Sequence, residues 1–341
     1  MTKNKRVTSY DVAREAGVSQ SAVSRVFRPG LSVSQKTRDK VMTTANSMGY
    51  RPNAIARMLI TKQSGMVAVI VSSRANVNYP EVLSQVSKQL AARNKRVLLF
   101  TLDDAEGLKA LFEQILTFQV DGVIALAAHF ESDLLAQFAE QKIPVVLYNR
   151  TVPDAIANTV CCNHELGIKQ LINELEKNNP ETYLVLSGPK NSDVANERRE
   201  IALNLLAQHA INNVSVLYGD YSYQSGRNCL AKWLLKNPVP DAIICSNDTM
   251  AIGVIDEARE NHGLHIPNDI SVVGFDGITS SAWQSYQITT IKQPVEQLVK
   301  AAVGMLLERI ENPEAPPESR VLTGALMKGN SVKRPQLTEI I

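Results

Sequence analysis

Residues 6–60 read RVTSYDVAREAGVSQSAVSRVFRPGLSVSQKTRDKVMTTANSMGYRPNAIARMLI. Apolar residues recur in this stretch at helical spacing. The pattern predicts three short helices, over 10–16, 20–27 and 34–48. Three such helices, with a tight turn between the first two, are the layout of a helix-turn-helix DNA-binding head.

Polar residues stand in front of the predicted helices. Thr8 or Ser9 can cap the first helix, and Ser19 can cap the second. Gly17 lies between them and suits a turn that needs a positive φ. The inner face of the second helix is expected to carry Ala22, Val23 and Val26.

The charge distribution favours a nucleic-acid-binding head. Residues 1–62 carry 12 Lys and Arg and 3 Asp and Glu, a net charge of +9, whereas the other 279 carry 24 and 31, a net charge of −7. A basic head on an acidic body is expected when one end of a chain meets phosphate. A disordered basic tail is the alternative, but such a tail would lack the regular apolar positions seen here.

Particular side chains of the head are candidates for DNA contact. The amino-terminal residues of the second helix reach base edges in this motif. Gln20 can pair with adenine and Arg25 with guanine, whereas Lys36 and Arg38 are expected to touch phosphate. The candidates in the head are Thr8, Ser19, Gln20, Ser21, Ser24, Arg25, Lys36 and Arg38.

Residues 52–59 form a candidate hinge. Pro52 fits the first turn of a helix that is too short to be stable alone. The segment could fold when pressed against DNA and a partner copy, with contacts from Asn53, close approach at Ala56 and Leu59 as a wedge in the minor groove. A passive linker that packs Leu59 onto the body is an equally open alternative.

The remainder of the 341 residues predicts two α/β halves. Apolar runs of four to six residues alternate with amphipathic helices, which indicates parallel sheets. The runs are 66–71, 97–100, 122–127, 144–148, 183–186, 214–218, 242–245 and 271–275. Ligands bind such sheets in the crevice beyond the carboxyl ends of the strands.

Other classes of protein are disfavoured. No apolar stretch has the length of a membrane span, and the amino terminus MTKNKRVTS has no apolar segment after it, so we expect a cytoplasmic protein. The four cysteines have no C-x-x-C spacing and are expected to be buried thiols. No catalytic, metal or phosphate-loop motif is present, so neither an enzyme nor a cofactor is predicted.

Over essentially its full length, the chain resembles the LacI–GalR family of bacterial transcription regulators. The motifs that carry the resemblance are VTSYDVAREAGVSQSAVSRVF (7–27), VSQKTRDKV (33–41), GYRPNAIARML (49–59), PVVLYNR (144–150), CSNDTMAIGV (245–254), DISVVGFD (269–276) and TTIKQP (289–294).

The resemblance implies a fold and several residue roles. The body would be like a periplasmic sugar-binding protein, with chain crossings between its halves near 160–163, 289–293 and 321–323. Gln20, Ser21 and Arg25 fall at reading positions of the recognition helix, and Leu59 falls at the hinge leucine. The positions that would face an effector are Arg198, Asn247, Asp276 and the aromatic Tyr221.

Ten residues are candidates for binding an effector, because each lies at a strand's carboxyl end or in the loop that follows. They are Asn78, Tyr79, His129, Arg150, Asn163, Arg198, Tyr221, Asn247, Asp276 and Gln293. Arg150 could instead bridge a loop. Asp248 is expected to cap a helix that starts at Thr249.

Some of these positions depart from the family pattern. Asn163 replaces a usual aspartate, and residues 198–202 read RREIA where R-x-x-G-F is usual. The usual G-H pair is replaced by Asn179-Pro180. These changes indicate either an unusual ligand or a crevice no longer used.

The sequence therefore predicts a homodimeric repressor that binds a pseudo-palindromic double-stranded DNA operator and senses a small metabolite. Alternatives are an effector-independent DNA-binding regulator and, more remotely, a soluble ligand-binding protein or enzyme. The expected domains are a head (1–50), a hinge (51–62) and a body (63–341). The body would divide into an N-subdomain, about 63–160 plus 292–321, and a C-subdomain, about 163–289 plus 323–341.

Overall fold

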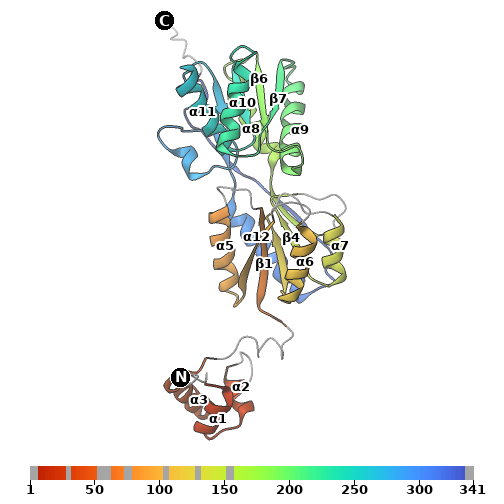
Figure 1. The fold of residues 1–341 in the computed structure, drawn as a ribbon, viewed down its shortest axis with the longest axis vertical. Coiled ribbons are helices and arrows are strands. Elements are labelled where there is room, and N and C mark those ends of the chain that lie inside the picture. Colours follow the sequence, from red (N-terminus) through yellow and green to blue (C-terminus); the bar gives the residue numbers. More distant parts are fainter. Residues whose placement is uncertain are drawn as a thin grey trace. The chain divides into compact units, whose positions relative to one another are not determined.

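The computed structural model describes residues 7–27, 32–51, 63–72, 79–102, 107–126, 132–150 and 157–334. The chain divides into two compact units, Met1–Ser64 and Gly65–Ile341. Figure 1 draws their elements, coloured along the sequence. Five candidates lie outside the described residues, namely Asn53, Ala56, Leu59, Asn78 and His129.

The first unit contains three helices, α1 (Ser9–Glu15), α2 (Gln20–Val26) and α3 (Gln35–Ser47). Their shared core is small and aliphatic, with Val12, Val23 and Val41 fully buried. The turn between α1 and α2 contains Gly17 at a φ of +57°. The three-helix prediction is confirmed, and each helix ends one residue before its predicted end.

A side-chain hydroxyl caps the amino-terminal end of each of the three helices. Thr8, rather than Ser9, caps α1, and it forms a reciprocal capping box with Asp11. Ser19 and Ser34 cap α2 and α3. Each cap satisfies backbone N–H groups that have no partner within the helix.

The first half of the second unit is built on a six-stranded parallel sheet in the order β11-β5-β4-β3-β1-β2. Its strands are β1 (Met66–Ser72), β2 (Arg96–Leu102), β3 (Gly122–Ala125), β4 (Val145–Tyr148), β5 (Asn158–Cys162) and β11 (Ser319–Leu322). Its helices are α5 (Tyr79–Ala91), α6 (Leu108–Thr117), α7 (Ser132–Glu140) and α12 (Val295–Glu311).

Alternate residues of these strands enter two separate cores. One core joins the sheet to α6 and α7, and the other joins it to α5 and α12. Blue α12 contacts orange α5, although the two are far apart in the sequence (Figure 1). The first half is therefore completed by residues that come late in the chain.

The second half is built on a four-stranded parallel sheet in the order β7-β6-β8-β9. Its strands are β6 (Tyr183–Ser187), β7 (Val214–Tyr218), β8 (Ala242–Cys245) and β9 (Ser271–Val273). Its helices are α8 (His164–Glu176), α9 (Asp193–Gln208), α10 (Tyr223–Leu234) and α11 (Asp248–His262). The order reverses at β6, so the loops after β6 and β8 flank a topological switch point.

Three short elements lie outside the two large sheets. A 3₁₀ turn η1 (Thr279–Ala282) follows β9, and β10 (Thr290–Lys292) pairs antiparallel with β12 (Ala325–Met327). The chain passes between the halves from β5 to α8, from β10 to α12, and from β11 to β12.

Three general features accompany this fold. All four cysteines are free and buried. Within the described ranges, no helix is long and apolar enough to cross a bilayer, and no cluster of three or more His, Cys, Asp or Glu side chains is placed to hold a metal ion.

Candidate functional site

The exposed face of α2 is the first candidate site. Ser19 Oγ accepts from the Ala22 N–H at 3.2 Å and lies 2.9 Å from Ser21 Oγ. Val23 and Val26 are buried in the core of the first unit, and Ser21 and Arg25 are exposed. The local fold therefore turns the polar face of α2 outward while its apolar face fixes the helix in place.

Gln20 and Arg38 have contacts within the same unit. Gln20 Nε2 donates to Ser9 Oγ at 3.3 Å, which ties the start of α2 to α1. Arg38 Nη1 donates to the Val26 carbonyl at 3.2 Å, which caps the last turn of α2. Arg38 therefore has a structural contact that the sequence did not predict, whereas Lys36 is exposed in the first turn of α3.

Thr8 and Ser24 are two further candidates of the head. Thr8 Oγ1 donates to Asp11 Oδ2 at 2.7 Å, so its hydroxyl serves the capping box. Ser24 is partly buried. Tyr10, at the start of α1, was not a candidate, yet its side chain is 72% exposed. The sequence feature that could have identified Tyr10 is an aromatic residue on the solvent side of an amphipathic helix.

Arg198 lies at the centre of the second candidate site, within the second half of the body. It is 5% exposed, and it donates from Nη1 to the Ser246 carbonyl at 2.8 Å and from Nη2 to Asp276 Oδ1 at 3.2 Å. Its Nη2 also lies 3.4 Å from His164 Nε2. The guanidinium stacks on Phe275 at 3.9 Å from the ring centroid. These four contacts therefore fix the position of the Arg198 guanidinium.

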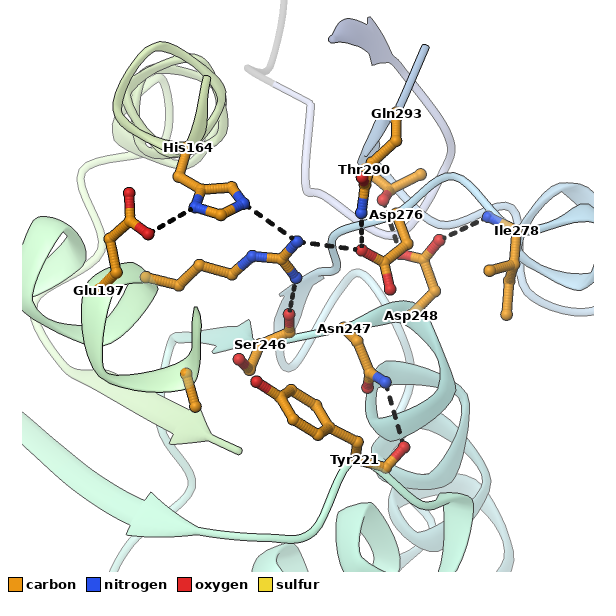
Figure 2. A network of polar contacts seen from close by, with 12 residues as sticks. His164, Glu197, Tyr221, Ser246, Asn247, Asp248, Asp276, Ile278, Thr290 and Gln293 are labelled. Atoms are coloured by element: carbon orange, nitrogen blue, oxygen red, sulfur yellow. Dashed lines mark hydrogen bonds and ion pairs between the residues drawn. The ribbon is translucent and has the colours of Figure 1, made fainter. Parts of the chain in front are cut away.

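Asp276 joins this arginine to the second chain crossing. Its Oδ1 also accepts from Gln293 Nε2 at 2.6 Å, and its carbonyl accepts from the Gln293 N–H at 3.1 Å. Its φ of 112° is a conformation that residues with a Cβ rarely adopt. The structure thus brings together three predicted candidates, Arg198, Asp276 and Gln293, and Figure 2 shows their network with the labelled Asp276 and Gln293 side by side.

Two asparagine candidates are helix caps. Asn163 Oδ1 accepts from the Leu166 N–H at 2.9 Å, and Asn247 Oδ1 accepts from the Met250 N–H at 2.9 Å. Asn247 also donates from Nδ2 to the Tyr221 carbonyl at 3.1 Å. The cap of α11 is therefore Asn247, and the expectation that Asp248 caps a helix starting at Thr249 is wrong by one residue.

Asp248 is instead fully buried behind Asp276. Its carboxyl oxygens accept from Thr290 Oγ1 at 2.6 Å and from the Ile278 N–H at 2.9 Å. Burial, with a smaller contribution from the Asp276 charge, raises the pKa of Asp248 to about 8. The carboxyl group links α11, the loop after β9 and β10.

Tyr221 closes over the carboxyl end of β6. Its hydroxyl lies 3.1 Å from Ser192 Oγ, and a Cβ placed on Gly188 would meet its ring at 2.4 Å. Burial raises the pKa of its phenol. A glycine is therefore required at position 188 for this ring to lie where it does.

Two of the effector-site candidates, Tyr79 and Arg150, lie in the first half of the body. Tyr79 accepts from the Ser72 N–H at 3.3 Å and donates to the Leu126 carbonyl at 3.4 Å, so it joins the ends of β1 and β3. Arg150 is 5% exposed and forms an ion pair with Asp193 at the start of α9. This pair links the two halves, whereas the alternative role for Arg150 was to bridge a loop.

His164 and Glu197 complete the polar cluster, and sequence reasoning did not select them. His164 Nδ1 lies 3.2 Å from Glu197 Oε2, and the ring of His164 meets Phe275 edge-on at 5.5 Å. Burial first, and then the Arg198 charge, lowers the pKa of His164. The histidine stands directly after the family's altered position at Asn163, which is the only sequence signal that pointed to it.

The comparisons with known proteins agree with this geometry. Residues 8–53 match the model of the lacI family of bacterial regulatory proteins, and residues 179–332 match a periplasmic binding protein-like domain. Catabolite control protein A of Priestia megaterium is 30% identical over 304 residues, which are 88% of this chain and 91% of that protein.

Solved structures give the same result. The Lac repressor dimer bound to operator and the anti-inducer ONPF is 28% identical, with a TM-score of 0.89 over 97% of this chain and 100% of that one. The complex of the transcriptional regulator CelR with cellobiose is 27% identical, with a TM-score of 0.72 over 96% and 100%. With its helix-turn-helix head and its two-half α/β body, the chain belongs to the lacI family of bacterial regulatory proteins.

Proposed function

We propose that this protein is a sequence-specific DNA-binding repressor of transcription. The observation that carries the proposal is the exposed face of α2, which presents Ser21 in its first turn and Arg25 in its last turn, on a helix fixed by the buried Val23 and Val26. Residues at the amino-terminal end of a recognition helix reach base edges in the major groove. The exposed Tyr10 and Lys36 would add contacts to phosphate.

The protein would act as a homodimer on a pseudo-palindromic operator. The Lac repressor relative binds its operator as a dimer, and dimeric heads read two half-sites. Since its operator would be chromosomal DNA, we place the protein in the cytoplasm.

The crevice around Arg198 and Asp276 would bind a small polar metabolite that alters operator affinity. The CelR relative is solved with cellobiose. Directional hydrogen bonds from carboxylate and amide groups recognise hydroxyl groups. A ligand that prefers one arrangement of the two halves would shift the protein between states of different operator affinity.

An effector-independent regulator is the second candidate. Several polar atoms of the candidates already have partners within the chain, namely Asn163 Oδ1, Asn247 Oδ1 and Nδ2, the two Nη atoms of Arg198 and the Tyr221 hydroxyl. A thermal-shift screen of cytosolic metabolites separates the two, since a ligand that binds only the folded state raises the melting temperature. The DNA-binding proposal itself is tested by selecting operators from random duplex DNA with the purified protein, and failure to enrich any sequence would refute it.

Arg25→Ala and Gln20→Ala should each reduce the discrimination between the selected operator and random DNA. The expected loss is about 1–3 kcal/mol for a bidentate base contact. Lys36→Ala is the control and should weaken both kinds of binding nearly alike. Fluorescence anisotropy with both duplexes measures the ratio. An equal loss on both duplexes for Arg25→Ala would reassign Arg25 to phosphate contact.

Asp276→Ala should abolish the response to an effector found in the metabolite screen, while operator affinity stays within a few-fold of wild type. The reason is that the side chain offers acceptors at the crevice but lies outside the DNA-binding unit. Asp269→Ala, which removes an exposed carboxylate elsewhere in the body, is the matched control. Titration of effector into the protein–operator complex gives the readout, and a retained response would rule out Asp276 as a ligand contact.

A further inference from the structure

His164 stands at the junction between the first chain crossing and the effector crevice. It is the first residue of α8, directly after β5, and its side chain is fully buried. Figure 2 shows it between the labelled Glu197 and the network that continues to Asp276. A buried imidazole in this place can influence both the crevice and the crossing.

A continuous series of contacts runs from α9 to the second crossing. Glu197 meets His164 at 3.2 Å, and His164 meets Arg198 at 3.4 Å. Arg198 then donates to Asp276 at 3.2 Å, and Asp276 accepts from Gln293 at 2.6 Å. Gln293 directly follows β10, where the chain returns to the first half. The series therefore joins the end of the first crossing, at His164, to the start of the second, at Gln293.

The chemistry of the series fixes the protonation state of the histidine. An arginine guanidinium can only donate, so His164 Nε2 must accept from Arg198. The proton of the neutral ring then sits on Nδ1, which faces the Glu197 carboxylate. A second proton on the ring would place an N–H group against a guanidinium N–H group, and the contact would become repulsive.

We infer that His164 is a positioning residue for Arg198, and that its protonation releases Arg198 and loosens the crossing at Gln293, which makes the effector crevice sensitive to acid. This inference rests on the proposed role of the crevice as an effector site. It adds a regulatory input, the proton, that acts on the same residues as the effector would.

The charged groups that face His164 act in opposite directions, since Glu197 and Asp276 favour the charged ring and Arg198 opposes it. From α9 come Glu197 and Arg198, and from the loop after β9 comes Asp276. Glu197 favours the charged ring, but its side chain is 36% exposed and screened by water, whereas Arg198 is buried and opposes the charge. Burial of the ring opposes the charge further.

The sign of the pH effect follows from this lowered pKa. The neutral ring is favoured in the folded state, so its contribution to stability is present above the ordinary imidazole pKa of about 6.5. That contribution is lost as the pH falls from there toward the folded pKa. Opening of the network should therefore become about tenfold more frequent per pH unit within that window.

His164→Gln tests the inference, because a glutamine amide can donate to Glu197 and accept from Arg198 but does not titrate near neutrality. We would measure backbone deuterium exchange of the full-length wild-type and variant proteins at pH 7.5 and 5. The peptides of interest cover 271–294, which include the bonds from the Asp276 N–H to Ile291 and from the Gln293 N–H to Asp276. Their sequence is identical in both proteins, so intrinsic exchange cancels at each pH.

The expected result is equal exchange at pH 7.5 and exchange about tenfold faster in wild type than in His164→Gln at pH 5. His265→Gln, at an exposed histidine, is the control and should behave like wild type at both values. Equal exchange of wild type and His164→Gln at pH 5 would overturn the inference. Faster exchange of His164→Gln at both values would show that ring shape rather than charge matters, and would overturn it too. The measurement uses no DNA and no effector, so its outcome is independent of whether the proposed function holds.

Discussion

Operator affinity is expected to fall by about 10³–10⁵ between about 50 and 200 mM salt, if the dimer neutralises roughly six to ten phosphates. The reason is the net charge of +9 on residues 1–62, which releases counterions from DNA on binding. A plot of log affinity against log salt should be linear. Lys36→Ala should reduce its slope by about 0.9 for each phosphate that the variant no longer neutralises. A flat titration would exclude phosphate contact as the main source of affinity.

Gly253→Ala is expected to destabilise the body by about 3 kcal/mol or more, at the upper end of overpacking costs. The helices α10 and α11 cross at this glycine, and a Cβ there would lie 2.1 Å from the Tyr223 carbonyl oxygen. Backbone atoms cannot rotate away as a flexible side chain can, so the two helices would have to separate. Urea unfolding followed by circular dichroism measures the loss.

Gly304→Ala is the matched control for this substitution. Gly304 lies within α12, and a Cβ there would meet nothing within 4 Å. Alanine in a helix interior is more favourable than glycine by roughly 0.5–1 kcal/mol, so this variant should be slightly more stable than wild type. Destabilisation of the same size in both variants would show that the close helix crossing is not the cause.

Much of the fold could be predicted from the sequence, because local runs of apolar residues determine where the strands form. The eight apolar runs all became strands. Six of these strands are buried, and buried parallel strands are apolar on both faces. The strands β5, β10, β11 and β12 were not among the predicted runs. These last three have three or four residues, and β11 is largely exposed, so neither length nor periodicity marked them.

The site was less predictable than the fold, because its contacts join distant residues. Arg198 and Asp276 were both named as candidates, but their ion pair spans 78 positions and no local pattern encodes it. His164 and Glu197 were missed for the same reason. Asn163 and Asn247 were named as candidates for ligand contact, and in the structure their side chains cap helices α8 and α11. Contact of these two asparagines with an effector stays a prediction.

The late arrival of α12 and β11 in the chain has a consequence for biosynthesis. The first half needs α12 to bury residues such as Val69 and Val86 against Leu298, and it needs β11 to cover the outer edge of β5. When residues 65–162 leave the ribosome, both pieces are still untranslated. The second half is contiguous from α8 to β10, but its core also includes Leu326 and Val332, which come later still. Neither half can therefore complete its core until nearly the whole chain has been synthesised.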